Sequence, residues 1–92
     1  MQMNVQGNIN KVLTAIRLKG VDIKIDRIEF YSERSKSYCT KYSVYVKEDT
    51  DDRYGNTVRR YCLQKEFFNK VPLLLYLVDY YKDIEKEGET NE

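Results

Sequence analysis

The sequence predicts a small α+β domain with the element order α-β-β-β-α, and three observations lead to this prediction. An apolar stripe of helical period opens the chain, three runs of period two follow it, and a second apolar-striped segment closes it. Short polar loops join the three runs, so we expect a three-stranded antiparallel meander covered by the two helices. The 92 residues suffice for one domain, which we place at residues 1–87, with residues 88–92 as a disordered acidic tail.

The first helix is expected over residues 9–19. Its apolar residues recur at i, i+3, i+4 and i+7, which places them on one helix face: Ile9, Val12, Leu13 and Ile16. Asn8 is the expected N-cap, because its side chain can accept hydrogen bonds from the amides of the first turn. Gly20 is the expected residue in the left-handed conformation that ends the helix.

The first strand begins near Val21, and its alternation changes phase. The apolar residues Ile23 and Ile25 occupy odd positions, whereas Ile28 and Phe30 occupy even positions. A strand that moves its apolar side chains to the other face needs an extra residue, so the pattern predicts a bulge or bend near residues 26–27.

The second and third strands follow a polar loop over residues 32–37. Along the second strand one face carries Tyr38, Thr40, Tyr42, Val44 and Val46, and the other carries Cys39, Lys41, Ser43, Tyr45 and Lys47. We expect an acidic turn over residues 48–56 and a third strand over about residues 57–65. The inward face of that strand stays open, because the pair Val58 and Cys62 and the pair Tyr61 and Leu63 fit equally well.

The last helix is expected from about Lys70 to Glu87, capped by Asn69. Two adjoining apolar stripes run along it: Leu73, Leu77, Tyr80 and Ile84 form one, and Leu74, Val78 and Tyr81 form the other. Leu75 and Tyr76 fall outside both stripes, so the first two turns are apolar on nearly every side. One small sheet cannot bury such a helix completely. We therefore predict that Leu75 and Tyr76 bind a partner or a second copy, unless the first helix and residues 67–68 cover them.

The chain offers little for catalysis. It contains no histidine, the most common general base and metal ligand near neutral pH. Cys39 and Cys62 form no Cys-x-x-Cys pair, and we expect free thiols, which could face each other across neighbouring strands. The four glycines show no phosphate-loop spacing. We expect no enzyme and no cofactor.

An acidic run that resembles the start of a calcium loop is expected to be a solvated turn instead. Asp49, Asp51 and Asp52 have the right spacing, but Arg53 and Tyr54 stand where the EF-hand pattern requires a ligand and a glycine. We therefore expect no metal site.

Tyrosine and basic residues indicate two alternative binding functions. The chain has nine tyrosines, and Tyr45 and Tyr61 are expected to share a sheet face with Lys41, Lys47 and Arg59. Tyrosine is enriched in protein interfaces, so Tyr45 and Tyr61 are predicted to bind a protein partner. Alternatively, aromatic rings that stack on bases, with Lys41, Lys47 and Arg59 on phosphates, would make the face a nucleic-acid site.

The charge distribution predicts a bipolar surface, and the lack of a signal sequence indicates where the protein is located. Residues 1–47 carry nine basic and four acidic groups, whereas residues 48–92 carry seven basic and eleven acidic groups, so the folded surface is expected to be bipolar. No signal pattern or membrane-length apolar run is present, and two cysteines without such a signal are typical of reduced thiols. We expect a cytoplasmic protein without membrane contacts.

The α-β-β-β-α order resembles the double-stranded-RNA-binding domain over most of the chain. That family carries a lysine-rich motif at the start of its second helix, and the matching stretch here is residues 64–70, Gln-Lys-Glu-Phe-Phe-Asn-Lys. Two lysines, an acid and two phenylalanines depart from that motif, so the resemblance implies the fold and no RNA-binding residue.

The size, the Lys/Ile/Tyr/Asn-rich composition and the run over residues 9–20 are similar to small uncharacterised phage and mobile-element proteins of Gram-positive bacteria. Such proteins, anti-CRISPR inhibitors among them, often bind and block a host protein. The resemblance implies a non-catalytic, inhibitory protein-binding module with a host protein as partner, and a homodimer is a further option.

Overall fold

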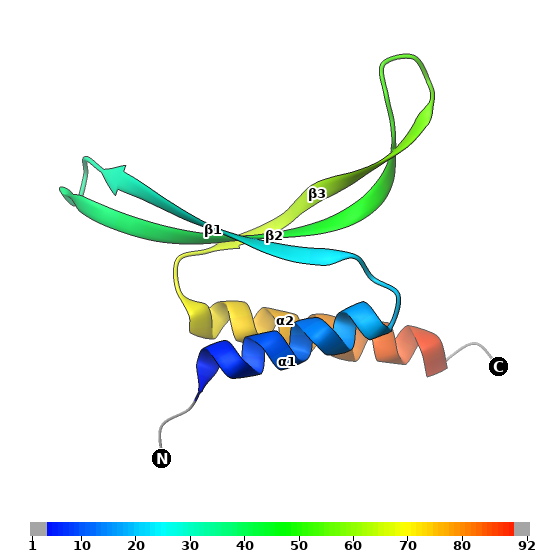
Figure 1. Ribbon diagram of the computed structural model, residues 1–92, viewed down its shortest axis with the longest axis horizontal. Coiled ribbons are helices and arrows are strands. Elements are labelled where there is room, and N and C mark those ends of the chain that lie inside the picture. Colours follow the sequence, from blue (N-terminus) through cyan, green and yellow to red (C-terminus); the bar gives the residue numbers. More distant parts are fainter. Residues whose placement is uncertain (1–3, 90–92) are drawn as a thin grey trace.

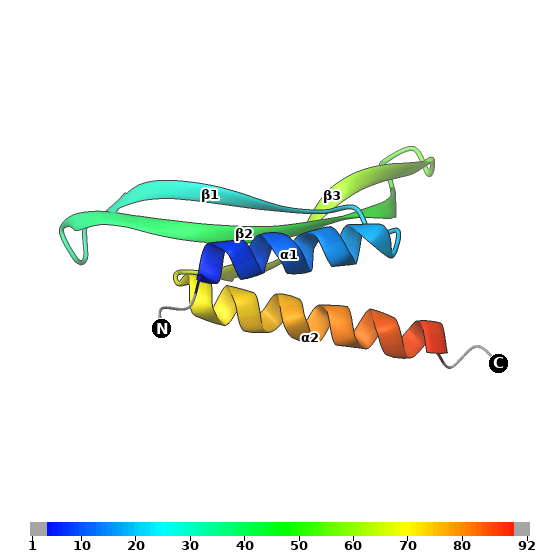
Figure 2. The same cartoon turned by 60° about the horizontal axis from the view of Figure 1, so that its bottom comes forward.

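The computed structural model describes residues 4–89 and confirms the predicted order of elements. Within this range the chain forms two helices and three strands: α1 Val5–Leu18, β1 Ile23–Ser32, β2 Ser37–Asp51, β3 Thr57–Phe67 and α2 Lys70–Glu89. Both strand pairs are antiparallel, and the sheet order is β1-β2-β3. Both helices lie on the same side of the sheet (Figures 1 and 2). The fold is therefore an α+β meander with two layers.

The core lies between the helices and the middle of the sheet. Nine apolar side chains are buried there among the described residues: Ile9, Leu13 and Ile16 of α1, Ile23, Val44 and Val46 of the sheet, and Leu73, Leu74 and Leu77 of α2. The α1 residues and the first α2 stripe are those that the helical period predicts. The β1–β2 hairpin extends beyond the helices at one end of the sheet, and the β2–β3 hairpin curls away from them at the other (Figure 1).

The helix α1 begins four residues earlier than predicted. The N-cap is Asn4, not Asn8, and its side-chain Oδ1 accepts a hydrogen bond from the backbone N–H of Gly7 at 2.9 Å. The extra turn brings Val5 against the core, which favours the earlier start. The predicted end is confirmed, because Gly20 has a φ of +94° directly after the C-cap.

The predicted bulge in β1 is wrong. β1 pairs with β2 in continuous register from Ile23 to Ser32, and the irregularity lies instead between β2 and β3. There Val44 pairs with Lys65 and Tyr45 with Leu63, which leaves Gln64 as the extra residue. The phase change in β1 has another cause: its later apolar residues belong to the sheet face opposite the helices.

The acidic turn is shorter than predicted, because β2 continues through Asp51. Glu48 pairs with Arg60 and Asp49 with Arg59, so opposite charges face each other across the hairpin. The turn itself is held by Asp52, whose Oδ1 accepts from the backbone N–H groups of Tyr54 at 2.8 Å and Asn56 at 2.9 Å.

The helix α2 has the predicted cap but a later end. The side chain of Asn69 accepts from the N–H of Val71 at 2.9 Å. The helix continues through Glu89, so residues 88–89 belong to it and not to the predicted tail, and residues 90–92 lie outside the described residues.

The molecule is flat and extended. Its radius of gyration is 16.1 Å and its extents are 50 × 46 × 16 Å. A compact domain of this length would have a radius of gyration of about 12 Å. The two hairpins account for this shape, because one reaches past the helices and the other curls away from them, while the helices cover only the centre of the sheet (Figure 1).

Candidate functional site

The sheet face opposite the helices, which we call the open face, is a surface that neither helix covers (Figures 1 and 2). It consists of alternate residues of the three strands: Lys24, Asp26, Ile28 and Phe30 of β1, Lys41, Ser43, Tyr45, Lys47 and Asp49 of β2, and Arg59, Tyr61, Leu63 and Glu66 of β3. Leu63 is 48% exposed, Tyr61 39% and Ile28 38%. Large apolar groups and charged groups are therefore interspersed on one accessible surface.

An aromatic and basic cluster occupies one part of the open face. The Lys24 ammonium lies 4.6 Å from the ring centroid of Tyr61 and 5.3 Å from that of Tyr45, and the Lys47 ammonium lies 5.4 Å from the Tyr61 ring. The Tyr61 hydroxyl donates to Asp22 Oδ1 at 2.7 Å. This hydrogen bond raises the pKa of Tyr61 above its ordinary value, because ionisation would remove the donated proton. The hydroxyl stays protonated, and the ring is held in place.

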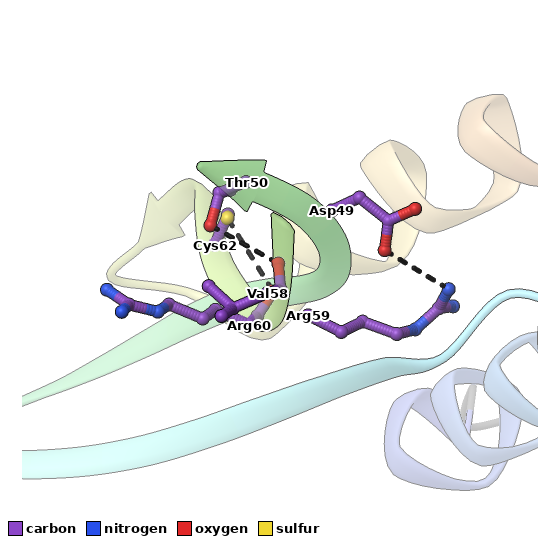
Figure 3. Close-up of polar contacts among 6 residues, drawn as sticks. All are labelled: Asp49, Thr50, Val58, Arg59, Arg60 and Cys62. Atoms are coloured by element: carbon purple, nitrogen blue, oxygen red, sulfur yellow. Dashed lines mark hydrogen bonds and ion pairs between the residues drawn. The ribbon is translucent and has the colours of Figure 1, made fainter. Parts of the chain in front are cut away.

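The structure confirms that Tyr45 and Tyr61 share a face with Lys41, Lys47 and Arg59. Most of these cations have an acidic neighbour. Lys41 lies 3.4 Å from Glu66, and Arg59 lies 3.7 Å from Asp49. Figure 3 shows the Arg59 side chain reaching across the hairpin to Asp49, whereas Arg60 extends in the opposite direction. The open face is thus close to charge balance and is not a basic stripe.

Ser43 lies at the centre of the open face and is nevertheless 1% exposed. Its hydroxyl has no hydrogen-bond partner among the described residues. Asp26 and Glu66 stand opposite it on the neighbouring strands. The side chains around Ser43 therefore close over it and make a continuous surface at the centre of the sheet.

The other two predicted partner-binding residues lie elsewhere, on α2. Tyr76 is half-buried, with its ring 5.4 Å from that of Phe67 and 6.3 Å from that of Tyr80, and burial raises its pKa. Phe67 thus covers Tyr76, as the alternative interpretation anticipated. Leu75 remains 61% exposed. The four residues therefore belong to two separate surfaces, because α2 lies on the covered side of the sheet.

Sequence reasoning missed Ile28, Leu63 and Phe68 as members of the exposed apolar surface. Phe68 is 68% exposed, and its ring meets that of Phe30 edge-on at 6.3 Å. Two features of the sequence could have revealed this surface: the phase change in the apolar alternation of β1, and the undecided inward face of β3. Both patterns reflect a sheet with apolar residues on both faces. The structure resolves the ambiguity: Cys62 pairs with the buried Val46 on the helix side, and Tyr61 and Leu63 lie on the open face.

The cysteines and carboxylates do not converge on a reaction centre. Cys39 and Cys62 are free, and they lie on opposite faces of the sheet, so the idea that they face each other is wrong. Asp49 and Asp51 belong to β2, while Asp52 caps the turn. Across residues 4–89, no group of three or more metal-ligating side chains is found.

Neither helix in the described part of the chain is long and apolar enough to cross a membrane.

Comparison with known proteins finds no match: no family model fits the chain, and neither the curated proteins nor the solved structures give a significant similarity.

Proposed function

We propose that the protein is a non-catalytic protein-binding module that docks a partner protein on its open face. The observation that carries this proposal is a sheet face with exposed Leu63, Tyr61 and Ile28 that no described segment covers. Exposed apolar groups framed by polar groups are typical of interaction sites. Tyrosine contributes a large contact area at low conformational cost, so Tyr45 and Tyr61 are the proposed anchors.

The total surface supports the same proposal. The chain exposes 7207 Å² for a mass of 11.0 kDa. A compact monomer of that mass exposes about 5,600 Å², so the excess is about 1,600 Å². A partner in a standard interface covers about 800 Å² on each side. The extended molecule thus exposes more surface than a compact monomer would, by more than one side of a standard interface covers.

The charge pattern favours a protein as the partner. Acidic neighbours balance Lys41 and Arg59 on the open face, so this face offers a polyanion little net positive charge. The Lys47 ammonium lies over the Tyr61 ring, and a single cation gives little affinity for a phosphate backbone. These contacts make nucleic-acid binding the less supported alternative.

The resemblance to small phage and mobile-element proteins indicates the kind of partner. We propose a host protein that is blocked stoichiometrically, as an anti-CRISPR inhibitor blocks its target. An interface that excludes a second ligand needs only area and complementarity, and it requires no catalytic group.

Matched variants test this proposal. Leu63→Lys places a charge on the open face. Leu75, a predicted partner contact that remains exposed, lies on the helix side of the sheet, so Leu75→Lys places the same charge where a partner docked on the open face does not reach. Both positions are exposed, so both variants should fold. We expect a partner protein that co-purifies with the wild type and with Leu75→Lys, and is lost with Leu63→Lys. Retention by Leu63→Lys would contradict the proposal, and light scattering on each pure protein would show whether a second copy is the partner.

A further inference from the structure

A pocket of about 380 Å³ lies on the helix side of the sheet, away from the open face. All four of the elements α1, β1, β2 and α2 contribute to its wall. Its floor is apolar and formed by the core residues Ile9, Leu13 and Leu73. This volume falls within the range of about 300–1,000 Å³ that is usual for small-molecule sites.

Every charged residue that lines the pocket is basic. These residues are Arg17, Lys24, Arg27 and Lys70, although the chain as a whole is nearly neutral. The ammonium group of Lys24 lies on the open face, beside Asp26 and the Tyr61 ring. Three cationic groups from three different elements therefore remain around the apolar floor. No acidic side chain of the described residues lines the pocket to balance these cations, so an anion bound there would gain favourable electrostatic energy.

The three cations differ in how firmly they are held. The Arg17 Nε and Nη2 donate to the Ile23 carbonyl at 3.1 and 2.9 Å, which fixes the guanidinium at the Ile23 end of the pocket, about 13 Å along β1 from Arg27. Arg27 lies 2.7 Å from Glu29, but both side chains are more than half exposed, so the pair is weak and exchangeable. Lys70 makes no ion pair with any described residue.

We propose that this pocket binds a small organic anion with one anionic head and an apolar body, such as an aliphatic carboxylate. The head lies between Arg27 and Lys70, the body lies on Leu13 and Leu73, and Arg17 adds positive charge at the opposite end of the pocket. The charge complementarity selects the anion, and the apolar floor selects a body without polar groups. This site is independent of the open face and of the partner proposed for it.

Nuclear magnetic resonance titrations of the full chain test the site with two matched probes, octanoate and 1-octanol. We expect saturable amide shifts in α1 and β1 for both probes, with octanoate bound about fivefold more tightly because of its charge. The variant Arg27→Gln/Lys70→Gln should abolish this preference, whereas the control Lys82→Gln on the exposed side of α2 should retain it.

A second variant tests the location of the site by steric obstruction and leaves the charges unchanged. Asn10 is exposed at the pocket wall, so Asn10→Trp should obstruct the pocket without disturbing the core, and both probes should bind less tightly. Equal affinities for octanoate and 1-octanol in the wild type would overturn the inference. So would shifts confined to the open face, or an octanoate preference that survives in Arg27→Gln/Lys70→Gln.

Discussion

At the scale of single residues, the packing at the centre of the sheet buries the Ser43 hydroxyl and affects stability. Its buried hydroxyl lacks a partner among the described residues, and such a group costs about 1–3 kcal/mol in desolvation. We therefore expect Ser43→Ala to raise the free energy of unfolding by about 1 kcal/mol, as measured by urea denaturation. Ser37→Ala, at the exposed start of the same strand, is the control and should have no such gain. A loss of stability in Ser43→Ala would show that the hydroxyl is hydrogen-bonded.

Tyr76 and Tyr80 should make stability depend on alkaline pH. Burial raises the pKa of both residues above the ordinary value of 10.0, because the apolar surroundings disfavour the phenolate. On raising the pH, the unfolded chain loses these protons first, so their contribution to stability is complete below about pH 10 and declines above it.

A denaturation series between about pH 9 and about pH 11 checks this dependence. Because phenylalanine does not ionise, Tyr76→Phe/Tyr80→Phe should lose less stability over this range than the wild type. Tyr54→Phe, in the exposed β2–β3 turn, is the control. An unchanged slope in the double variant would show that these two residues do not control the dependence.

At the scale of the elements, α2 separates structural from exposed apolar residues within one turn. Leu77 is fully buried, so Leu77→Ala should lower the free energy of unfolding by about 2–5 kcal/mol. Leu75 is 61% exposed, and Leu75→Ala should change the free energy of unfolding by no more than about 0.5 kcal/mol. Thermal and urea denaturation give both values. A large cost at Leu75 would mean that another surface buries it.

A helix or strand could be predicted from the sequence where a single physical rule determines it, and could not where two rules compete. Helical spacing and alternation located all five, because apolar residues with a regular period have one favoured face. The start of α1 was missed since Asn4 and Asn8 are equally good caps, and only the contact of Val5 with the core distinguishes them. The length of β2 was missed because charge pairs such as Asp49–Arg59 extend a hairpin, although each residue alone is typical of a turn.

The candidate site could be predicted only in part, because some of its contacts depend on how the strands pair. The shared face of Tyr45 and Tyr61 follows from strand alternation, and the structure confirms it. The apolar contribution of Ile28 and Leu63 needs the register of three strands, which the sequence does not contain. The ion pairs of Lys41 and Arg59 depend on that register too, so the loss of basic character could not be foreseen.

At the scale of the whole molecule, this charge balance predicts weak nucleic-acid binding. We expect dissociation constants no tighter than about 1 mM for single- and double-stranded DNA and RNA at low salt, measured by fluorescence anisotropy. The variant Asp49→Asn/Glu66→Gln frees Arg59 and Lys41 and should increase the affinity and its salt dependence. Tight, steeply salt-dependent binding by the wild type would favour the nucleic-acid alternative.

From the flat shape and the uncovered sheet face we infer that another protein covers the open face. Photo-crosslinking in the native source tests it most directly, with p-benzoylphenylalanine placed at Leu63 or, as the control, at Leu75. Both sites are about half exposed or more, so both can react with a neighbour. We expect an adduct with a different polypeptide at position 63 and none at position 75. No adduct at position 63, or the same adduct at both positions, would contradict it.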